Sequence, residues 1–263
     1  MGINIIKITG TNGTYVGDRG KEKYLAIHYT AGVTSRKGSA RNTAEYFKTA
    51  SGTADFIVDD EEIVQYNPDP NKYSCWAVGG DAYGNKGGRL HGVANNHNCI
   101  SIEICSTNKT GRVTKANDGN WYFTEKAVSN AVKLAVYLMN KYNIPLSRVI
   151  RHYDVTGKYC PGIKGWNTDS GSDAAWQAFK NRLAAEARTS GGSTQTPAPS
   201  AIKWAVTVTL LRIRKGPGTN YAWTGRYTGK GVFTIVERKN GWGRLKSGAG
   251  WISLSTEYGH RVG

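Results

Sequence analysis

The stretch Ile100-Ser101-Ile102-Glu103-Ile104-Cys105 decides the fold of the first part of this 263-residue chain. Isoleucine alternates with small or polar residues, which is the two-residue period of a β-strand with one apolar face. That face predicts a packed core, and Glu103 lies on the opposite face. A carboxylate in mid-strand is either solvated on a bare sheet face or buried with a partner. If a cleft covers this face, Glu103 is a candidate general acid or base.

Segments on both sides of this strand predict a mixed β-sheet flanked by helices. Strands are expected at residues 24–29, in a hairpin of 56–58 and 62–65, and at 148–151. Helices are expected at 39–50, from a Thr124 cap to Pro145, and at 173–188. Strands that alternate with helices indicate an α/β fold, in which catalytic residues lie at strand ends and in the adjoining loops.

Three side chains at such positions form a candidate zinc site. His28 lies at the end of the first strand, His152 follows the strand at 148–151, and Cys160 lies eight residues later in a loop rich in turn residues. A catalytic zinc site typically has three protein ligands of these types. The alternative is a solvated loop histidine and a buried cysteine. Lys158 could stabilise a developing oxyanion in the same loop, although a loop lysine is more often only solvated.

A change in composition divides the chain into two domains. Residues 189–201 are rich in Gly, Ser, Thr and Pro, which predicts a flexible linker between a domain at 1–188 and a second at 202–263. In the second domain, short strands separated by glycine turns predict a small all-β barrel.

The formal charge of +16 is concentrated near the C-terminus. Residues 201–263 hold 11 lysines and arginines against 2 acidic residues, a local charge of +9. The basic residues are interleaved with glycine and tryptophan, without a basic helix or an RNA-binding motif. An anionic cell envelope suits this charge as well as nucleic acid does. The charge alone leaves both partners open.

The N-terminus and the cysteines bear on the compartment. The first apolar run turns polar at Thr9, too early for a secretory signal, and no run could span a bilayer. We therefore expect synthesis in the cytoplasm without a signal peptide and no membrane insertion. The four cysteines do not form a disulfide framework, so reduced thiols are expected. A monomer is the favoured oligomeric state.

Three motifs resemble the zinc-dependent N-acetylmuramoyl-L-alanine amidases (type 2 amidases), a family that includes phage lytic amidases and peptidoglycan-recognition proteins. The resemblance covers roughly residues 20–185, in the family's order. The motifs are Leu25-Ala26-Ile27-His28-Tyr29-Thr30-Ala31-Gly32, Asn96-His97-Asn98-Cys99-Ile100-Ser101-Ile102-Glu103, and Arg151-His152-Tyr153-Asp154 through Lys158-Tyr159-Cys160-Pro161-Gly162.

The resemblance implies a Zn²⁺ ion held by His28, His152 and Cys160, with Glu103 and Lys158 beside it. It also implies cleavage of the amide between N-acetylmuramic acid and the L-alanine of the stem peptide. Zinc would activate a water, the glutamate would carry its proton to the leaving amine, and the lysine would help to hold the oxyanion.

The chain departs from the family after its first helix. Many relatives carry a tyrosine or serine followed by a histidine there, whereas this chain reads Thr53-Ala54-Asp55-Phe56. No tyrosine is available to assist the oxyanion. We expect Asp55 to contact substrate or to orient a ligand histidine. Trp76 and His97 are the other candidate substrate-binding residues, although a tryptophan beside apolar residues is more often core.

Residues 211–218, 240–245 and 250–252 resemble a bacterial SH3-like wall-binding module. This resemblance implies adhesion, with Trp242 and Trp251 as candidate cell-wall-binding residues. A wall anchor raises the effective substrate concentration for a tethered enzyme. The whole chain is therefore expected to be a phage endolysin that acts on the bacterial cell wall after release. The two resemblances imply peptidoglycan and the cell wall as its partner, and no nucleic acid.

Two other classes on the same wall substrate remain open. A non-catalytic peptidoglycan-binding protein would keep the groove but could lack the thiolate ligand, and Cys160 argues against it. A cysteine peptidase that uses Cys75 with His91 or His97 would need no metal and would resist chelators.

Overall fold

The computed structural model describes residues 3–16, 23–80, 87–168, 171–190, 201–239 and 241–262. The chain forms two compact units, Met1–Ser190 and Gly191–Gly263. Of the expected linker at 189–201, residues 191–200 lie outside the described residues.

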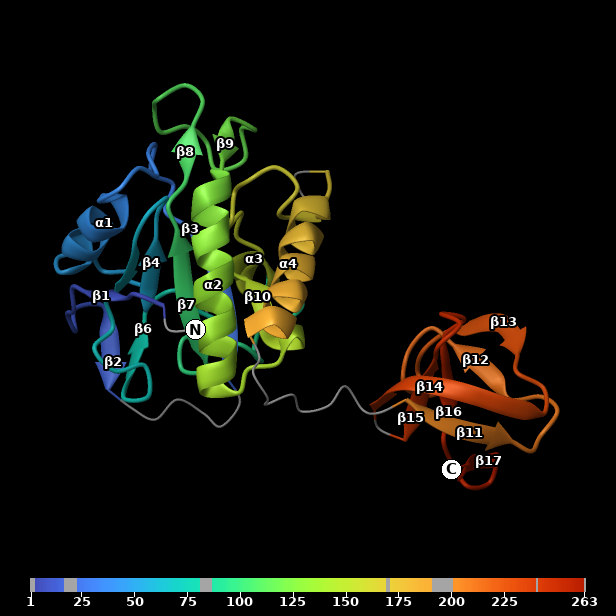
Figure 1. Ribbon diagram of the computed structural model, residues 1–263. Helices are drawn as coiled ribbons and strands as arrows, with labels where there is room; N and C mark the ends of the chain where they lie inside the picture. The colour runs from blue at the N-terminus through green and yellow to red at the C-terminus, as the bar shows by residue number, and fades with distance from the viewer. Residues whose placement is uncertain are drawn as a thin grey trace. The chain divides into compact units, whose positions relative to one another are not determined.

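The first unit is built on a six-stranded mixed sheet with the order β1-β5-β4-β7-β3-β10 (Figure 1). Strands β3, β4, β7 and β10 run parallel to their neighbours in this set, whereas β4 and β5 form the expected antiparallel hairpin. Two small antiparallel ladders, β2–β6 and β8–β9, lie outside this sheet. The strands are β1 Ile6–Lys7, β2 Thr14–Val16, β3 Tyr24–Tyr29, β4 Phe56–Val58, β5 Ile63–Gln65, β6 Tyr73–Cys75, β7 Cys99–Ile104, β8 Thr107–Asn108, β9 Trp121–Tyr122 and β10 Val149–Arg151.

Helices α2 (Glu125–Tyr142) and α4 (Ala174–Ser190) cover one face of this sheet. The isoleucines of β7 pack in this core, as their period predicts. Thr124 caps α2, since its hydroxyl accepts a hydrogen bond from the backbone N–H of Ala127. The helix ends at Asn143 in the left-handed conformation. Pro145 instead precedes a short 3₁₀ helix at Leu146–Arg148, so it does not itself close α2.

Helices α1 (Ser39–Phe47) and α3 (His152–Thr156) lie on the other face. Helix α1 ends three residues before the expected end at residue 50. Helix α3 occupies the first part of the segment that was expected to be a loop, and that expectation was wrong for residues 152–156. The first turn of α3 is closed by a hydrogen bond of 2.9 Å, which the backbone N–H of Arg151 donates to the carboxylate of Asp154. The polar side chains of β3 and β7 face this side of the sheet.

The second unit is a seven-stranded antiparallel sheet with the order β13-β12-β16-β15-β14-β11-β17 (Figure 1). Its closely packed strands surround an apolar core that includes Trp204, Ile213 and Ile252. This architecture is compatible with the SH3-like barrel expected from the sequence. The strands are β11 Ile202–Val206, β12 Arg212–Arg214, β13 Trp223–Tyr227, β14 Gly231–Lys239, β15 Trp242–Leu245, β16 Trp251–Ser253 and β17 Gly259–Val262.

A search of the described residues for helices with the length and apolarity needed to cross a bilayer finds none.

Candidate metal and catalytic site

His28 and Glu103 are direct neighbours on two adjacent strands. Strand β3 pairs in parallel with β7, and the register places His28 opposite Glu103. Both side chains lie on the face opposite the isoleucine core, because each follows the two-residue period of its strand. The alternating pattern predicted the face for Glu103, and the pairing of the strands adds the histidine beside it.

The three candidate metal ligands converge on this face. Strand β10 also pairs in parallel with β3, so its end brings His152 next to His28, with ring centroids 4.8 Å apart. The Sγ atom of Cys160 lies 3.6 Å from Nδ1 of His28, although the two residues are 132 positions apart. The ligand atoms of the three side chains all lie within 4.8 Å of one another, and all three residues are buried. They form a possible metal site.

Hydrogen bonds orient both imidazole rings toward the shared centre. Nε2 of His28 lies 3.3 Å from the hydroxyl oxygen of Ser101, which leaves Nδ1 facing Cys160. The ring of His152 bonds to the backbone of Val78. Burial lowers the pKa of His28 well below its ordinary value and the pKa of His152 to about 3. Both rings are therefore neutral at pH 7, which is the form that binds a metal ion.

Cys160 is held by backbone contacts on both sides. The Tyr153 N–H donates to the Cys160 carbonyl at 2.9 Å, which ties α3 to the cysteine. The next peptide bond, Cys160–Pro161, is cis, and the Pro161 carbonyl accepts from the side-chain amide of Asn167 at 2.9 Å. Burial raises the pKa of the Cys160 thiol, and the nearby Glu103 charge adds to this effect.

Glu103 and Lys158 line the same pocket of about 350 Å³ as the three candidate ligands. Among the described residues, Oε2 of Glu103 is buried and has no hydrogen-bond partner. Burial raises the pKa of Glu103 to about 7, while the Lys158 charge acts in the opposite direction. A pocket therefore covers this sheet face at Glu103, which is the arrangement that the expectation of a general acid or base requires.

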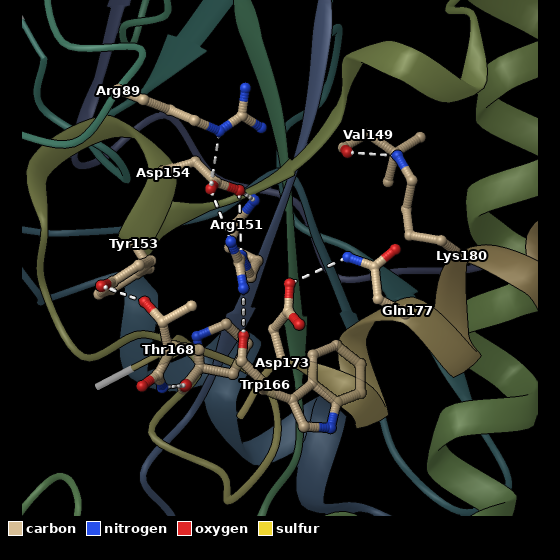
Figure 2. A network of polar contacts seen from close by, with 12 residues as sticks. Arg89, Val149, Arg151, Tyr153, Asp154, Trp166, Thr168, Asp173, Gln177 and Lys180 are labelled. Carbon is tan, nitrogen blue, oxygen red and sulfur yellow. Dashed lines mark hydrogen bonds and ion pairs between the residues drawn. The ribbon is translucent and has the colours of Figure 1, made fainter. Parts of the chain in front are cut away.

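A polar network of residues that do not line the pocket supports α3 (Figure 2). The guanidinium of Arg151 donates to both carboxylate oxygens of Asp154, at 3.1 and 2.8 Å, and to the Trp166 carbonyl at 2.8 Å. Arg89 adds an ion pair to Asp154 at 3.3 Å. Lys180 of α4 donates to the Val149 carbonyl at 2.7 Å. These contacts fix the end of β10, from which His152 projects.

Asp55 is buried and does not line the pocket, so of its two expected roles its contacts favour the support of a ligand histidine. Its side chain is 0% exposed and accepts from the side-chain amide of Asn67 at 2.6 Å and from the Ser101 N–H at 2.8 Å. Because Ser101 in turn contacts His28, Asp55 supports a candidate ligand through Ser101 of strand β7. Ala54 is fully buried in the core under α1, so neither residue replaces the missing tyrosine in the pocket.

Trp76 lies at the pocket and is not a core residue, since it is 49% exposed. The ring centroids of Trp76 and Tyr15 are 5.0 Å apart. The Tyr15 ring also stacks on the His97 ring, with centroids 5.0 Å apart. Sequence reasoning named Trp76 and His97 but missed Tyr15, which lies on the separate strand β2 and carries no motif. Cys75, the nucleophile of the peptidase alternative, is 2% exposed.

Comparisons with known proteins agree on one family. Residues 18–163 match the profile of the family described as N-acetylmuramoyl-L-alanine amidase. The N-acetylmuramoyl-L-alanine amidase CwlA of Bacillus subtilis (strain 168) is 28% identical over 191 residues, covering 72% of this chain and 59% of CwlA. The amidase CwlH of the same strain is 34% identical over 150 residues, covering 55% of this chain and 50% of CwlH. The chain thus spans about half the length of these curated relatives.

Among solved structures, the catalytic domain of XlyA is 27% identical to this chain. The alignment covers 69% of this chain and 99% of that domain, with a TM-score of 0.49.

Proposed function

This chain belongs to the N-acetylmuramoyl-L-alanine amidase family, and from that premise we propose that its first unit hydrolyses peptidoglycan. The bond cleaved is the amide between N-acetylmuramic acid and the L-alanine of the stem peptide. The observation that carries this proposal is the convergence of His28, His152 and Cys160 with the unpartnered carboxylate of Glu103 in one pocket.

The donor set fits a zinc ion. Two neutral imidazoles and one sulfur, all buried and mutually within 4.8 Å, match the number and type of ligands at catalytic zinc sites. Burial disfavours a bare thiolate at Cys160, and a coordinated divalent cation offsets that cost. When bound, zinc polarises the amide carbonyl and lowers the pKa of a water molecule to about 7.

Glu103 moves the proton in this proposal. A carboxyl group with a pKa of about 7 exchanges protons readily at neutral pH, so it accepts one from the attacking water and gives it to the leaving amine of alanine. Its free Oε2 has no competing partner among the described residues. Lys158 lines the same pocket and offsets the negative charge that develops on the amide oxygen.

Trp76 and His97 bind substrate at the rim of the pocket in this proposal. The exposed Trp76 ring provides an apolar face on which a sugar or a peptide can stack. Tyr15 lies between Trp76 and His97, so the three rings form one continuous surface beside the candidate zinc site.

The second unit binds the bacterial cell wall as an SH3-like module and keeps the hydrolase near its substrate. Trp242 lines a groove on this unit, whereas Trp251 is 9% exposed and contributes mainly to packing. The protein acts as an endolysin, a monomer that reaches the wall after its release from the cytoplasm.

Digestion of purified peptidoglycan tests the reaction. We expect new alanine amino termini without new reducing sugar ends, and loss of this activity on chelation with recovery on addition of zinc. New reducing ends would identify a glycosidase, and chelator-resistant lysis would rule out the metal mechanism.

The variant Glu103→Gln tests the role of the carboxylate. Removing a general acid and base is expected to lower kcat by about 10² to 10⁴-fold, because proton transfer by a positioned side chain contributes this much. Zinc content, measured by atomic absorption, should stay near one ion per chain. Cys160→Ser is the contrasting variant and should lower zinc content as well as turnover. If Glu103→Gln keeps wild-type turnover, the sheet-face carboxylate has no part in catalysis.

A further inference from the structure

The strand register of the second unit gathers arginine and aromatic side chains on one outer face. Arg212 and Arg214 flank the buried Ile213 on β12, so both lie on the side away from the core. Arg214 is opposite Trp251 of β16 and opposite Trp223 of β13. On the same side, Trp242 of β15 is opposite Ser253. The register therefore places both arginines on the same side of the sheet as these three tryptophans.

A groove of about 640 Å³ lies on this face. Arg212, Arg214, Trp242 and Ser253, which the register places on one side, all line it. Leu210 also lines the groove and is 69% exposed. Glu257 lines the groove as well, so this hollowed face presents apolar, cationic and acidic groups. We call these six residues together the arginine–tryptophan groove.

An aromatic pair on the neighbouring strand extends the groove. Trp223 and Tyr227 of β13 are 42% and 39% exposed, with ring centroids 5.2 Å apart. The indole N–H of Trp223 already donates to the Arg226 carbonyl at 2.9 Å, so the ring offers its apolar face to a ligand. The Arg212 guanidinium lies 5.6 Å from the Trp223 ring centroid, which joins the cation to this platform.

Among the described residues, neither arginine of the groove forms an ion pair, although the carboxylate of Glu257 lines the same groove. Arg244 on the same sheet forms an ion pair with Glu237 at 2.8 Å. In the part of the chain that the structure describes, neither Arg212 nor Arg214 forms a salt bridge. Arg214 instead donates to the Tyr221 carbonyl at 2.8 Å, which orients its guanidinium. Two positioned cations outside any ion pair outnumber the one carboxylate of the groove, and with a local charge of +9 on the unit they favour an anionic ligand.

We propose that the arginine–tryptophan groove binds a wall polymer made of sugars linked by phosphodiesters. Guanidinium groups match the geometry of phosphate oxygens, and the faces of Trp223 and Trp242 suit sugar rings. A repeating polyanion also matches the charge of the whole unit, which a neutral glycan strand does not. This inference rests on the proposed function, since it names the wall component that the second unit recognises.

Sedimentation with purified walls tests the proposal. The full chain carries Glu103→Gln so that the walls stay intact, and the walls come from a Gram-positive bacterium that has such polymers. One sample is left native, and a second is treated with hydrofluoric acid to cleave phosphodiesters. We expect the chain to bind native walls at least about tenfold more tightly than stripped walls, as expected for lost charge-assisted contacts, and to release as salt rises. Equal binding to both samples overturns the proposal.

Variants then locate the site. Arg212→Gln combined with Arg214→Gln should reduce binding to native walls about tenfold or more and leave binding to stripped walls unchanged. Trp223→Ala should weaken binding without any change in charge. Lys203→Gln with Arg261→Gln removes the same charge from exposed positions on β11 and β17, and should retain most of the binding. An equal loss in this control would mean that net charge alone attracts the wall, against the proposal.

Two further measurements distinguish wall binding from nucleic-acid binding and from a loss of folding. Single-stranded DNA at matched phosphate concentration should fail to displace the chain from native walls, and full displacement would favour nucleic acid as the ligand. Thermal unfolding of each variant should match that of the parent. Because binding is measured without turnover, failure of the amidase assay would leave this result readable, and failure here would leave the amidase proposal intact.

Discussion

At the scale of single residues, the candidate site depends on side chains that never enter the pocket. Asp154, in the first turn of α3, is buried and receives three hydrogen bonds from Arg151, one from the backbone and two from the guanidinium. Burial alone would raise the pKa of Asp154, but the bonds and charge of Arg151 outweigh it and hold the pKa below its ordinary value. His152 lies between these two residues in the chain, so its position depends on this ion pair.

The variant Asp154→Asn tests that dependence. It leaves the Arg151 guanidinium buried without its counter-ion, which costs about 3 to 5 kcal/mol of the free energy of unfolding at pH 7. Because the folded-state pKa is depressed, the stabilisation by Asp154 is complete above the unfolded pKa and is lost as pH falls through the folded pKa. The difference between wild type and variant, measured by urea unfolding, should therefore shrink in acid.

Arg89→Gln is the matched control for this network. Arg89 also pairs with Asp154, but its side chain is 66% exposed, so its loss should cost no more than about 1 kcal/mol. A pH-independent difference for Asp154→Asn would mean that the carboxylate charge does not stabilise the fold.

At the scale of elements, parallel pairing brings the functional groups together. Strands β7, β3 and β10 lie side by side and end at the same edge, so Glu103, His28 and His152 meet there. The fourth group, Cys160, comes from the segment after α3. In that segment the backbone at Gly162 packs closely against the backbone at Ala116. A Cβ atom at position 162 would be 2.0 Å from the Ala116 carbonyl oxygen.

Gly162→Ala should therefore displace the segment that carries Cys160. A methyl group at position 162 must push this segment away from the backbone at Ala116. We expect the free energy of unfolding to fall by about 1 to 3 kcal/mol and the affinity for zinc to weaken. Competition with a chromogenic chelator measures the affinity. Gly52→Ala is the control for stability, because its Cβ atom would lie 3.4 Å from the nearest heavy atom. Wild-type zinc affinity in Gly162→Ala would show that this close approach does not position the cysteine.

At the scale of the whole molecule, each unit has its own apolar core. The first unit packs α2 and α4 on its mixed sheet, and the second packs strands around Trp204 and Ile252. The first unit also contains all of the candidate metal and catalytic residues. The proposed hydrolysis and the proposed wall binding therefore belong to separate units.

Deleting residues 191–263 tests that separation. The shortened chain should keep its zinc and hydrolyse a soluble muramyl peptide within about twofold of the full chain, while its binding to intact walls falls by about 10²-fold or more as the anchor is lost. Both rates are measured in parallel with sedimentation. Equal losses in the two assays would contradict a division of labour between the units.

The sequence by itself determined the elements and most of the candidate site residues. The alternation in 99–104 predicts a strand and the face of Glu103, and the Thr124 cap predicts the start of α2, because both signals depend only on neighbours in the chain. The family motifs added His28, His152, Cys160 and Lys158 as candidates.

Only the tertiary structure decided what surrounds each of these groups. It buried Asp55 away from the pocket, left Oε2 of Glu103 without a partner among the described residues, placed Tyr15 between Trp76 and His97, and hollowed a groove beside Arg212. The physical reason is that burial and proximity arise from strand pairing between distant segments, as between His28 and Cys160, 132 residues apart. The periodicity within one strand does not predict which other strands pair with it.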